Sequence, residues 1–154
     1  MSNNDFSPGI LLFEVENADQ NYTVVFKRDK DNYIDIRLRL TGIPYLIGPF
    51  DDETRAKFIY IYLVYQNGGR NFEIISSIDT YFPKDALEKD FIEVSARLDV
   101  LPNQVYETNF VSTYYYVIVG TRENQIQDEN EIDFTATNRE NAILFTKIYT
   151  SIDE

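Results

Sequence analysis

The side chains that could perform chemistry in this chain are carboxylates, lysines and tyrosines, because its 154 residues include no His and no Cys. Without these two residue types the chain cannot form a Ser-His-Asp or Cys-His arrangement, and it has neither thiolate nor imidazole to hold a structural zinc ion. We therefore expect a protein that is not an enzyme and has no cofactor. Calcium binding is still possible without His and Cys, because calcium takes oxygen ligands.

Three acidic clusters lie where the sequence predicts loops. Loops at one end of a β-sandwich can supply the roughly six to eight oxygen ligands that calcium takes. The first cluster begins like a calcium-binding loop but lacks the Gly and the closing Glu of such loops. Solvated acidic turns have the same composition, so calcium is the weaker interpretation. The weak candidate ligands are Asp29, Asp31, Asp35, Asp128, Glu129 and Glu131.

Tyrosines in two apolar segments, residues 58–65 and 114–120, form a second set of candidates. Alternate side chains of a strand point to opposite faces, and both segments are apolar on both faces. A sandwich buries one face of each sheet, so a loop, a short helix or another protein must cover the other face. Tyrosine suits an interface, since its ring buries area while its hydroxyl keeps a hydrogen bond. The interface candidates are Tyr60, Tyr62, Tyr114 and Tyr116.

Alternation of apolar and polar residues predicts strands along most of the chain. In residues 33–40, Ile and Leu alternate with Tyr, Asp and Arg, which is typical of a strand with one wet face. The Gly- and Pro-containing residues 41–57 predict a loop that crosses between sheets, and Asn67-Gly68 predicts a hairpin. The first three strands are predicted to form a meander, from residues 10–17, 22–28 and 33–40.

The second half of the chain contains one ambiguous segment, residues 81–101, which shows both helical and strand spacing. Pro83 predicts a short helix to about Lys89, followed by a strand to Val100. Further strands are predicted at residues 112–121, 132–137 and 142–150.

These segments predict an all-β protein: an antiparallel two-sheet β-sandwich, Ig-like or jelly-roll-like, with eight to ten strands and at most one short helix. A single domain spans residues 1–154, with frayed termini at 1–5 and 151–154. Around residues 96–110, a Leu-Pro-Asn corner before Tyr106 resembles immunoglobulin-like and fibronectin-like modules. That similarity has no Trp or Cys partner, so we assign no family from it.

Charge and hydropathy limit the partners. Asp and Glu total 26 against 14 Lys and Arg, and the formal net charge of -12 opposes binding to nucleic acid, since the arginines are scattered. The apolar runs fall short of the roughly 20 residues of a membrane-spanning helix, and the first residues lack the features of a signal peptide. We expect a cytoplasmic or virion protein with no membrane contact.

We therefore predict a non-enzymatic structural or interaction protein that uses tyrosine-rich strand faces for self-assembly or for docking on a protein partner. It would be a homo-oligomer or an assembly subunit, as accessory components of phage or virus particles are. One alternative is a carbohydrate- or ligand-binding module that stacks tyrosines on sugar rings, although the chain has no Trp. Another is an acidic inhibitor, toxin-neutralising or anti-defence, whose carboxylates occupy a basic cleft.

Overall fold

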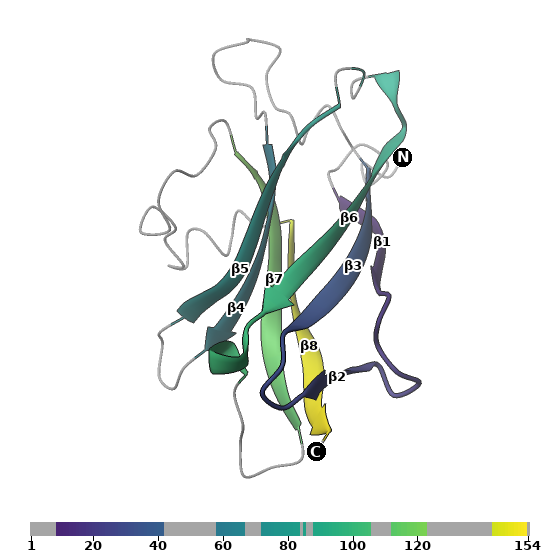
Figure 1. Cartoon of the computed structure of the whole chain (residues 1–154). Helices are drawn as coiled ribbons and strands as arrows, with labels where there is room; N and C mark the ends of the chain where they lie inside the picture. Colours follow the sequence, from purple (N-terminus) through teal and green to yellow (C-terminus); the bar gives the residue numbers. More distant parts are fainter. Residues whose placement is uncertain are drawn as a thin grey trace.

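Eight strands arranged in two sheets make up the described part of the protein (Figure 1). The computed structural model describes residues 9–41, 58–66, 72–83, 85, 88–105, 112–122 and 143–153. The strands are β1 (Gly9–Val15), β2 (Thr23–Lys27), β3 (Asn32–Thr41), β4 (Phe58–Gln66), β5 (Phe72–Tyr81), β6 (Phe91–Val100), β7 (Ser112–Arg122) and β8 (Leu144–Asp153). The predicted all-β, two-sheet architecture is confirmed.

The pairing of β2 corrects two predictions. One sheet has the order β1-β3-β6, and the other has the order β2-β8-β7-β4-β5. β2 therefore leaves its neighbours in sequence and pairs with β8 in parallel, from Thr23 opposite Tyr149 to Lys27 opposite Asp153. The predicted meander is wrong, and the five-stranded sheet is mixed rather than purely antiparallel. Alternation indicates which face of a strand is buried, but it does not indicate which strand lies beside it.

β3 and β6 form the best-defined pair of the three-stranded sheet. They are antiparallel over their whole length, from Asn32 opposite Val100 to Thr41 opposite Phe91. The side chains of β3 alternate as predicted: those that point inward are buried, and those that point outward are at least partly exposed. The buried set is Ile34, Ile36, Leu38 and Leu40.

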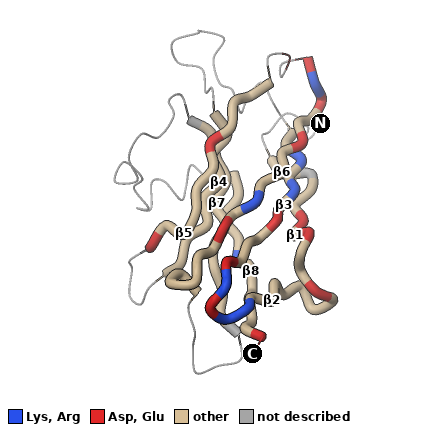
Figure 2. The backbone as a smooth tube through the Cα atoms, in the orientation of Figure 1, with Lys and Arg blue, Asp and Glu red and all other residues tan. Residues whose placement is uncertain are grey.

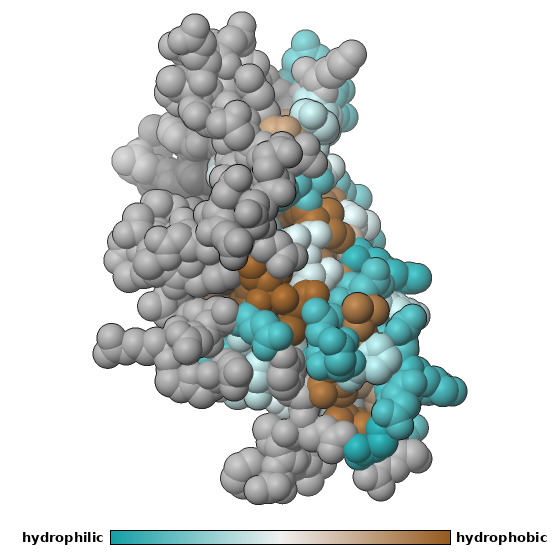
Figure 3. Space-filling model, turned by 60° about the vertical axis from the view of Figure 1, so that its left-hand side comes forward, coloured by the Kyte–Doolittle hydropathy of each residue, from teal (hydrophilic) through white to brown (hydrophobic). Residues whose placement is uncertain are grey.

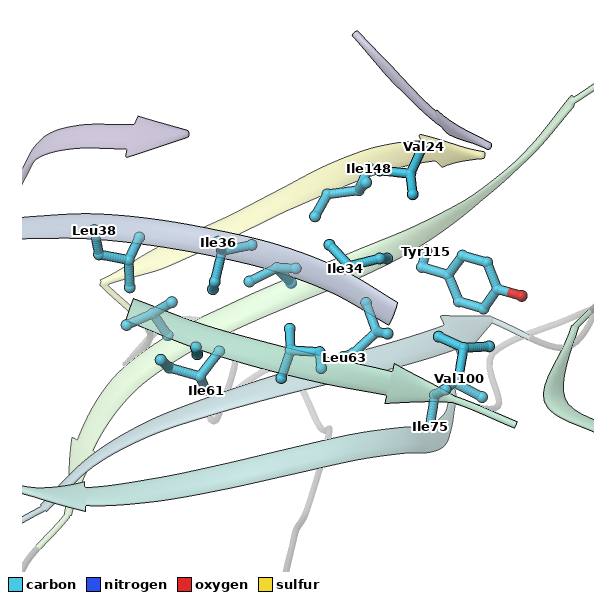
Figure 4. Packing of buried hydrophobic residues seen from close by; sticks show 14 of the residues in the cluster. Val24, Ile34, Ile36, Leu38, Ile61, Leu63, Ile75, Val100, Tyr115 and Ile148 are labelled. Atoms are coloured by element: carbon cyan, nitrogen blue, oxygen red, sulfur yellow. The ribbon is translucent and has the colours of Figure 1, made fainter. Parts of the chain in front are cut away.

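The main core lies between the two sheets (Figure 4). Ile34, Ile36 and Leu38 of β3 face the other sheet, which contributes Ile61 and Leu63 of β4. Burying one such side chain fully contributes about 1.5–3 kcal/mol. This core therefore supplies a large part of the stability.

β4 and β5 form the predicted hairpin. They pair antiparallel from Phe58 opposite Tyr81 to Gln66 opposite Phe72, with a register shift between Leu63 and Val64. The Asn-Gly turn itself lies outside the described residues. β3 and β4 belong to different sheets, so the connection between them crosses the sandwich as predicted.

A 3₁₀ turn, η3 (Pro102–Gln104), closes one end of the core. The fully buried Tyr115 of β7 donates a hydrogen bond from its hydroxyl to the Gln104 carbonyl at 3.0 Å. The Gln104 amide donates in turn to the Ile75 carbonyl of β5 at 3.2 Å. These bonds satisfy a buried hydroxyl and tie η3 to both β5 and β7. Tyr106, the residue of the predicted corner, lies outside the described residues.

Three smaller predictions have different outcomes. The predicted short helix from Pro83 to Lys89 lies only partly within the described residues, where the Glu88 N–H donates to the Asp85 carbonyl at 2.9 Å. β8 continues to Asp153 in register with β2, so residues 151–153 belong to the sheet and are not a frayed end. The predicted strand at residues 132–137 lies outside the described part.

No helix among the described residues is long and apolar enough to cross a membrane.

β2 is an edge strand whose outward backbone groups are mostly occupied. The Asp19 carboxylate accepts from the Thr23 N–H at 3.0 Å, and the Asp19 N–H donates to the Thr23 carbonyl at 2.8 Å. The Asn32 side chain accepts from the Lys27 N–H at 2.8 Å and donates to the Lys27 carbonyl at 3.0 Å. Among the described residues of this edge, Val25 alone keeps outward backbone groups without such a bond.

Along another side of the sandwich, hydrophobic residues reach the surface in a band beside hydrophilic ones (Figure 3). This view brings forward the side on which β5 lies in Figure 1. Some side chains of β5 and β6 contact the core and stay partly exposed, among them Ile78 and Val94. Some apolar side chains that contact the core are therefore still partly accessible to solvent on this side.

A candidate docking face on the five-stranded sheet

The outer face of the five-stranded sheet is unusually aromatic for a surface that points away from the core. Across the central strands, Tyr62 lies opposite Ile118, and Tyr116 lies opposite Lys147. We call this surface the aromatic face, and its members on β4, β7 and β8 are Tyr60, Tyr62, Val64, Tyr114, Tyr116, Ile118, Phe145, Lys147 and Tyr149.

The β4 half of the aromatic face is buried. Tyr60 and Tyr62 are 9% and 3% exposed in the single chain, and their rings stack with centroids 4.7 Å apart and planes 15° apart. Val64 and Ile118 belong to the same small apolar cluster, separate from the main core. β4 is therefore buried on both faces within one chain, so Tyr60 and Tyr62 do not require a partner to cover them.

Gly120 of β7 makes the position of the Tyr60 ring possible. Tyr60 lies opposite Gly120 across the strands, and a Cβ atom added at Gly120 would overlap the phenol end of the Tyr60 ring. A residue without a side chain lets the ring lie directly over the backbone of β7. The glycine thus shapes the buried half of the aromatic face.

The β7–β8 half of the aromatic face is exposed. Tyr114 and Tyr149 lie opposite each other and are 38% and 48% exposed. Their rings meet edge to face, with centroids 6.1 Å apart and planes 65° apart, and Tyr114 makes a similar contact with Tyr116 at 5.5 Å and 82°. Phe145 continues the row beside Tyr116, with a centroid distance of 4.9 Å. Aromatic pairs prefer such tilted geometries.

Lys147 stands among these rings. Its Nζ atom lies 4.5 Å from the centroid of the Tyr114 ring and 5.9 Å from that of Tyr116. Both distances allow a cation–π interaction. Within the part of the chain that the structure describes, no carboxylate lies within salt-bridge distance of Lys147. The ammonium group is exposed, and the neighbouring side chains on its face are aromatic.

The hydroxyl of Tyr116 responds to this environment. Burial and the neighbouring Tyr114 raise the pKa of Tyr116, and the Lys147 ammonium acts in the opposite direction. Tyr116 therefore stays neutral near neutral pH, and Lys147 is the basic residue beside it on this face. The exposed half of the aromatic face thus carries one positive charge and no negative one.

Tyr22 adjoins this face and has an unusual backbone. It is 85% exposed, and its φ of 60° lies in the left-handed region, which is uncommon for a bulky residue. The Asp19 carbonyl accepts the Tyr22 N–H at 3.0 Å and helps to hold this conformation. The next residue, Thr23, lies opposite Tyr149.

The outer face of the three-stranded sheet is charged instead (Figure 2). Lys, Arg, Asp and Glu recur along β1, β3 and β6, whereas β4 and β7 show few charges (Figure 2). The three arginines of β3 and β6 each bind a carboxylate on a neighbouring strand. The pairs are Arg37 with Glu14 at 3.0 Å, Arg39 with Glu93, and Arg97 with Asp35 at 2.9 Å.

The acidic candidates do not assemble into a site where the structure describes them. Asp35 is bound to Arg97, and no group of three acidic side chains among the described residues could hold a metal ion. Asp29 and Asp31 are exposed in the turn between β2 and β3. The other three weak calcium candidates, Asp128, Glu129 and Glu131, lie outside the described residues.

Sequence reasoning identified two residues of the exposed half, Tyr114 and Tyr116, but missed Tyr149 and Lys147. The alternation in β8 could have indicated these residues, because Phe145, Lys147 and Tyr149 alternate with residues that point inward, such as Ile148. The sequence does not show that β8 lies beside β7, and this pairing alone brings Tyr149 next to Tyr114.

No family model and no curated protein matches this sequence. Among solved structures, the chain is similar to beta-glucosidase from Listeria innocua in complex with isofagomine, with 9% sequence identity and a TM-score of 0.36. The match covers 92% of this chain and 16% of that chain, so this chain spans a small part of the enzyme's length. A likeness this weak carries no argument about activity.

Proposed function

We propose that this protein is a non-enzymatic interaction protein that docks another protein surface on the exposed half of its aromatic face. The observation that carries this proposal is the cluster of Tyr114, Tyr149 and Lys147, in which two half-exposed rings meet edge to face and the Tyr114 ring lies under a cation that has no carboxylate partner among the described residues. The surrounding strands fix these side chains in place, so little conformational freedom is lost when a partner binds.

Physical chemistry favours a protein partner for such a surface. Tyrosine is enriched among the residues that dominate binding energy, because a rigid ring buries much area. A protein surface can accommodate rings at steep angles to one another. The carbohydrate alternative requires two or three exposed rings in one plane, whereas Tyr114 is inclined by 82° to Tyr116 and by 65° to Tyr149. The geometry therefore favours protein docking over sugar stacking.

The finer fold class is part of this proposal: we infer an immunoglobulin-like sandwich. In that fold, strands A, B and E share one sheet and strands C, F and G the other. The orders β1-β3-β6 and β8-β7-β4-β5 have this arrangement. The hydrogen bond from Tyr115 to Gln104 supports it as well, because many such sandwiches carry a tyrosine near the start of strand F that bonds to backbone upstream. Such domains often serve as interaction modules, which is an argument by analogy.

An accessory role in a phage or virus particle is one setting in which such a docking protein would work. The acidic-inhibitor alternative depends on carboxylates that lie outside the described residues, such as Asp128 and Glu129. Docking on the aromatic face is compatible with both a particle component and an inhibitor, so the aromatic face is the surface to test.

Oxidative footprinting of tyrosines tests the proposal. The labelling rates of Tyr114 and Tyr149 would be compared between the extract of cells that produce the protein and the purified, diluted chain. We expect both tyrosines to be protected in the extract by the bound partner. Tyr33 is the matched control, because it is 40% exposed and lies on the outer face of the other sheet.

Equal labelling of Tyr114 and Tyr149 in the extract and in the dilute chain would contradict docking at this face. Protection of Tyr33 to the same degree would show that the extract shields tyrosines in general. Only selective protection of the aromatic face supports the proposed function.

A further inference from the structure

We propose that the partner of the exposed aromatic face is a second copy of this chain, bound around a two-fold axis. Lys147 of each copy would lie against the Tyr114 and Tyr149 rings of the other. This inference rests on the docking function proposed above and adds the identity of the partner.

The first argument is self-complementarity. A two-fold interface brings the same patch of both copies together, so the patch must contain both halves of each interaction. The exposed aromatic face does: Lys147 supplies a cation, and Tyr114 and Tyr149 supply exposed ring surface. Lys147 already uses one face of the Tyr114 ring within its own chain at 4.5 Å. The ring of Tyr149, for which no such contact with a cation is found among the described residues, is available to the cation of a second copy.

The second argument is electrostatic. Each copy carries a formal net charge of -12, so two copies repel each other at long range. They can approach most easily through a surface without carboxylates. Among the described residues, the outward positions of β7 and β8 nearest Lys147 provide one, because none of them holds Asp or Glu, and the first carboxylate along the same row of β8 is Asp153. These nearest positions are Tyr114, Tyr116, Ile118, Phe145, Lys147, Tyr149 and Ser151.

The third argument is the contrast with the other outer face. There, Arg97 lies over the Tyr33 ring at 4.1 Å but also binds Asp35 through two hydrogen bonds, of 2.9 and 3.1 Å. That cation is already satisfied by its own chain. Lys147 has only rings beside it among the described residues, so its charge is free to meet a group from outside.

These arguments predict an unusual salt dependence. Added salt screens the repulsion between two acidic copies, since the Debye length falls from about 30 Å at 0.01 M to about 10 Å at 0.1 M ionic strength. A contact made of rings and cation–π pairs depends less on salt than a contact made of ion pairs. The dimer is therefore expected to tighten as salt rises from 0.02 to about 0.3 M, whereas an acidic partner held by Lys147 would be released.

The experiment is sedimentation equilibrium of the purified full chain over a concentration series at these two salt concentrations. We expect a monomer–dimer equilibrium whose Kd rises about tenfold or more in Tyr149→Ala, since each dimer loses the ring twice. Lys147→Glu is expected to abolish the dimer, because a carboxylate is repelled by the ring faces that attract the ammonium group and adds negative charge to two chains that are already acidic. Lys147→Arg keeps the cation and is expected to retain it.

Tyr33→Ala is the matched control, since it removes a tyrosine of similar exposure, 40% against 48% for Tyr149, from the outer face of the other sheet. Its dimer Kd should equal that of the parent. Thermal melting of every variant checks the fold, and a Tyr149→Ala variant that melts at the temperature of the parent but dimerises less supports the inference. Equal Kd values for Tyr149→Ala and the parent would overturn it.

The outcomes separate this inference from the function on which it rests. If the purified chain is a monomer at every concentration and salt while footprinting shows Tyr149 protected in the extract, self-association is wrong and a different partner occupies the face. If the chain is a monomer and Tyr149 is not protected, both the inference and the proposed function are wrong. A dimer that weakens with salt also overturns the inference, because ion pairs would then hold it.

Discussion

The outer faces of the two sheets use similar residues in opposite ways. Each places a cation over a tyrosine ring, Arg97 over Tyr33 at 4.1 Å and Lys147 over Tyr114 at 4.5 Å. On the three-stranded sheet the arginine also binds Asp35 of the neighbouring strand. On the five-stranded sheet the lysine has no carboxylate partner among the described residues. The cation of the first surface is paired within its own chain, whereas the second surface is the one that we propose for docking.

The aromatic face also differs within itself, since Tyr60 and Tyr62 are nearly buried and Tyr114 and Tyr149 are not. The difference teaches that an apolar outer face can serve two purposes at once. One half stabilises the fold as a second, small core, and the other half is the surface that we propose for recognition. Substitutions in the two halves should therefore have different consequences.

The largest expected effect comes from the buried half. Tyr60→Ala combined with Tyr62→Ala removes two stacked, buried rings and should lower the free energy of unfolding by about 3 kcal/mol or more. Tyr114→Ala combined with Tyr116→Ala should cost clearly less, because Tyr114 is largely exposed. Urea unfolding followed by circular dichroism measures both. Equal losses in the two double variants would contradict the division of the face into two halves.

Gly120→Ala should come next, with a loss of about 1–3 kcal/mol, because the new methyl group displaces the Tyr60 ring from its place over β7. In a Tyr60→Ala background the same change should cost much less, since the ring is absent. Gly9→Ala is a suitable control, because nothing lies near a Cβ atom at that position. A loss at Gly120 that is unchanged by removal of Tyr60 would show that another contact is responsible.

Tyr22→Asn should act in the opposite direction and raise the free energy of unfolding by about 0.5–1 kcal/mol. Asparagine tolerates the left-handed conformation that Tyr22 adopts, and almost no packing is lost at an 85% exposed side chain. Thermal unfolding measures the gain. If the strain serves recognition, the stabilised variant should also dock less well, and a variant that is less stable than the parent would show that the tyrosine is not strained.

The smallest effect concerns the charged face. A hydrogen bond from the Arg39 guanidinium, the largest of several influences, lowers the pKa of Glu93. A carboxylate with a lowered pKa in the folded state contributes stability above its unfolded pKa, and this contribution is lost as pH falls through the lowered value. Arg39→Gln should raise the pKa of Glu93 back toward the ordinary value of a glutamate. An NMR titration of the Glu93 carboxyl measures it, and an unchanged pKa would rule out Arg39 as the cause.

Much of the fold could be predicted because local patterns carry it. The alternation in β3 identified Ile34, Ile36, Leu38 and Leu40 as the buried set, since the side-chain period of a strand is fixed at two. The β4–β5 hairpin followed from a turn sequence that few other structures favour. Both are properties of residues close together in the chain.

The parts that could not be predicted depend on distant residues. Val24 and Phe26 point inward just as a meander would require, yet β2 pairs with β8, more than a hundred residues later in the chain. The doubly apolar pattern of β4 was read correctly, but only tertiary structure separates the covered Tyr60 from the exposed Tyr114. The sequence did not indicate Lys147 as a site residue, because a single lysine in a strand is common. Its position among rings arises from the pairing of β7 with β8.

The occupied edge of β2 has a consequence for the size of any assembly. A strand that keeps free N–H and C=O groups along its edge can recruit another strand, and then another, until a fibre forms. Asp19 and Asn32 occupy those groups at both ends of β2, so an incoming strand finds little more than Val25 to pair with. A two-fold contact through the aromatic face, by contrast, is consumed once two copies meet. If the proposed two-fold contact forms, growth along the β2 edge is hindered and the aromatic face is used up by two copies, so neither surface favours a polymer.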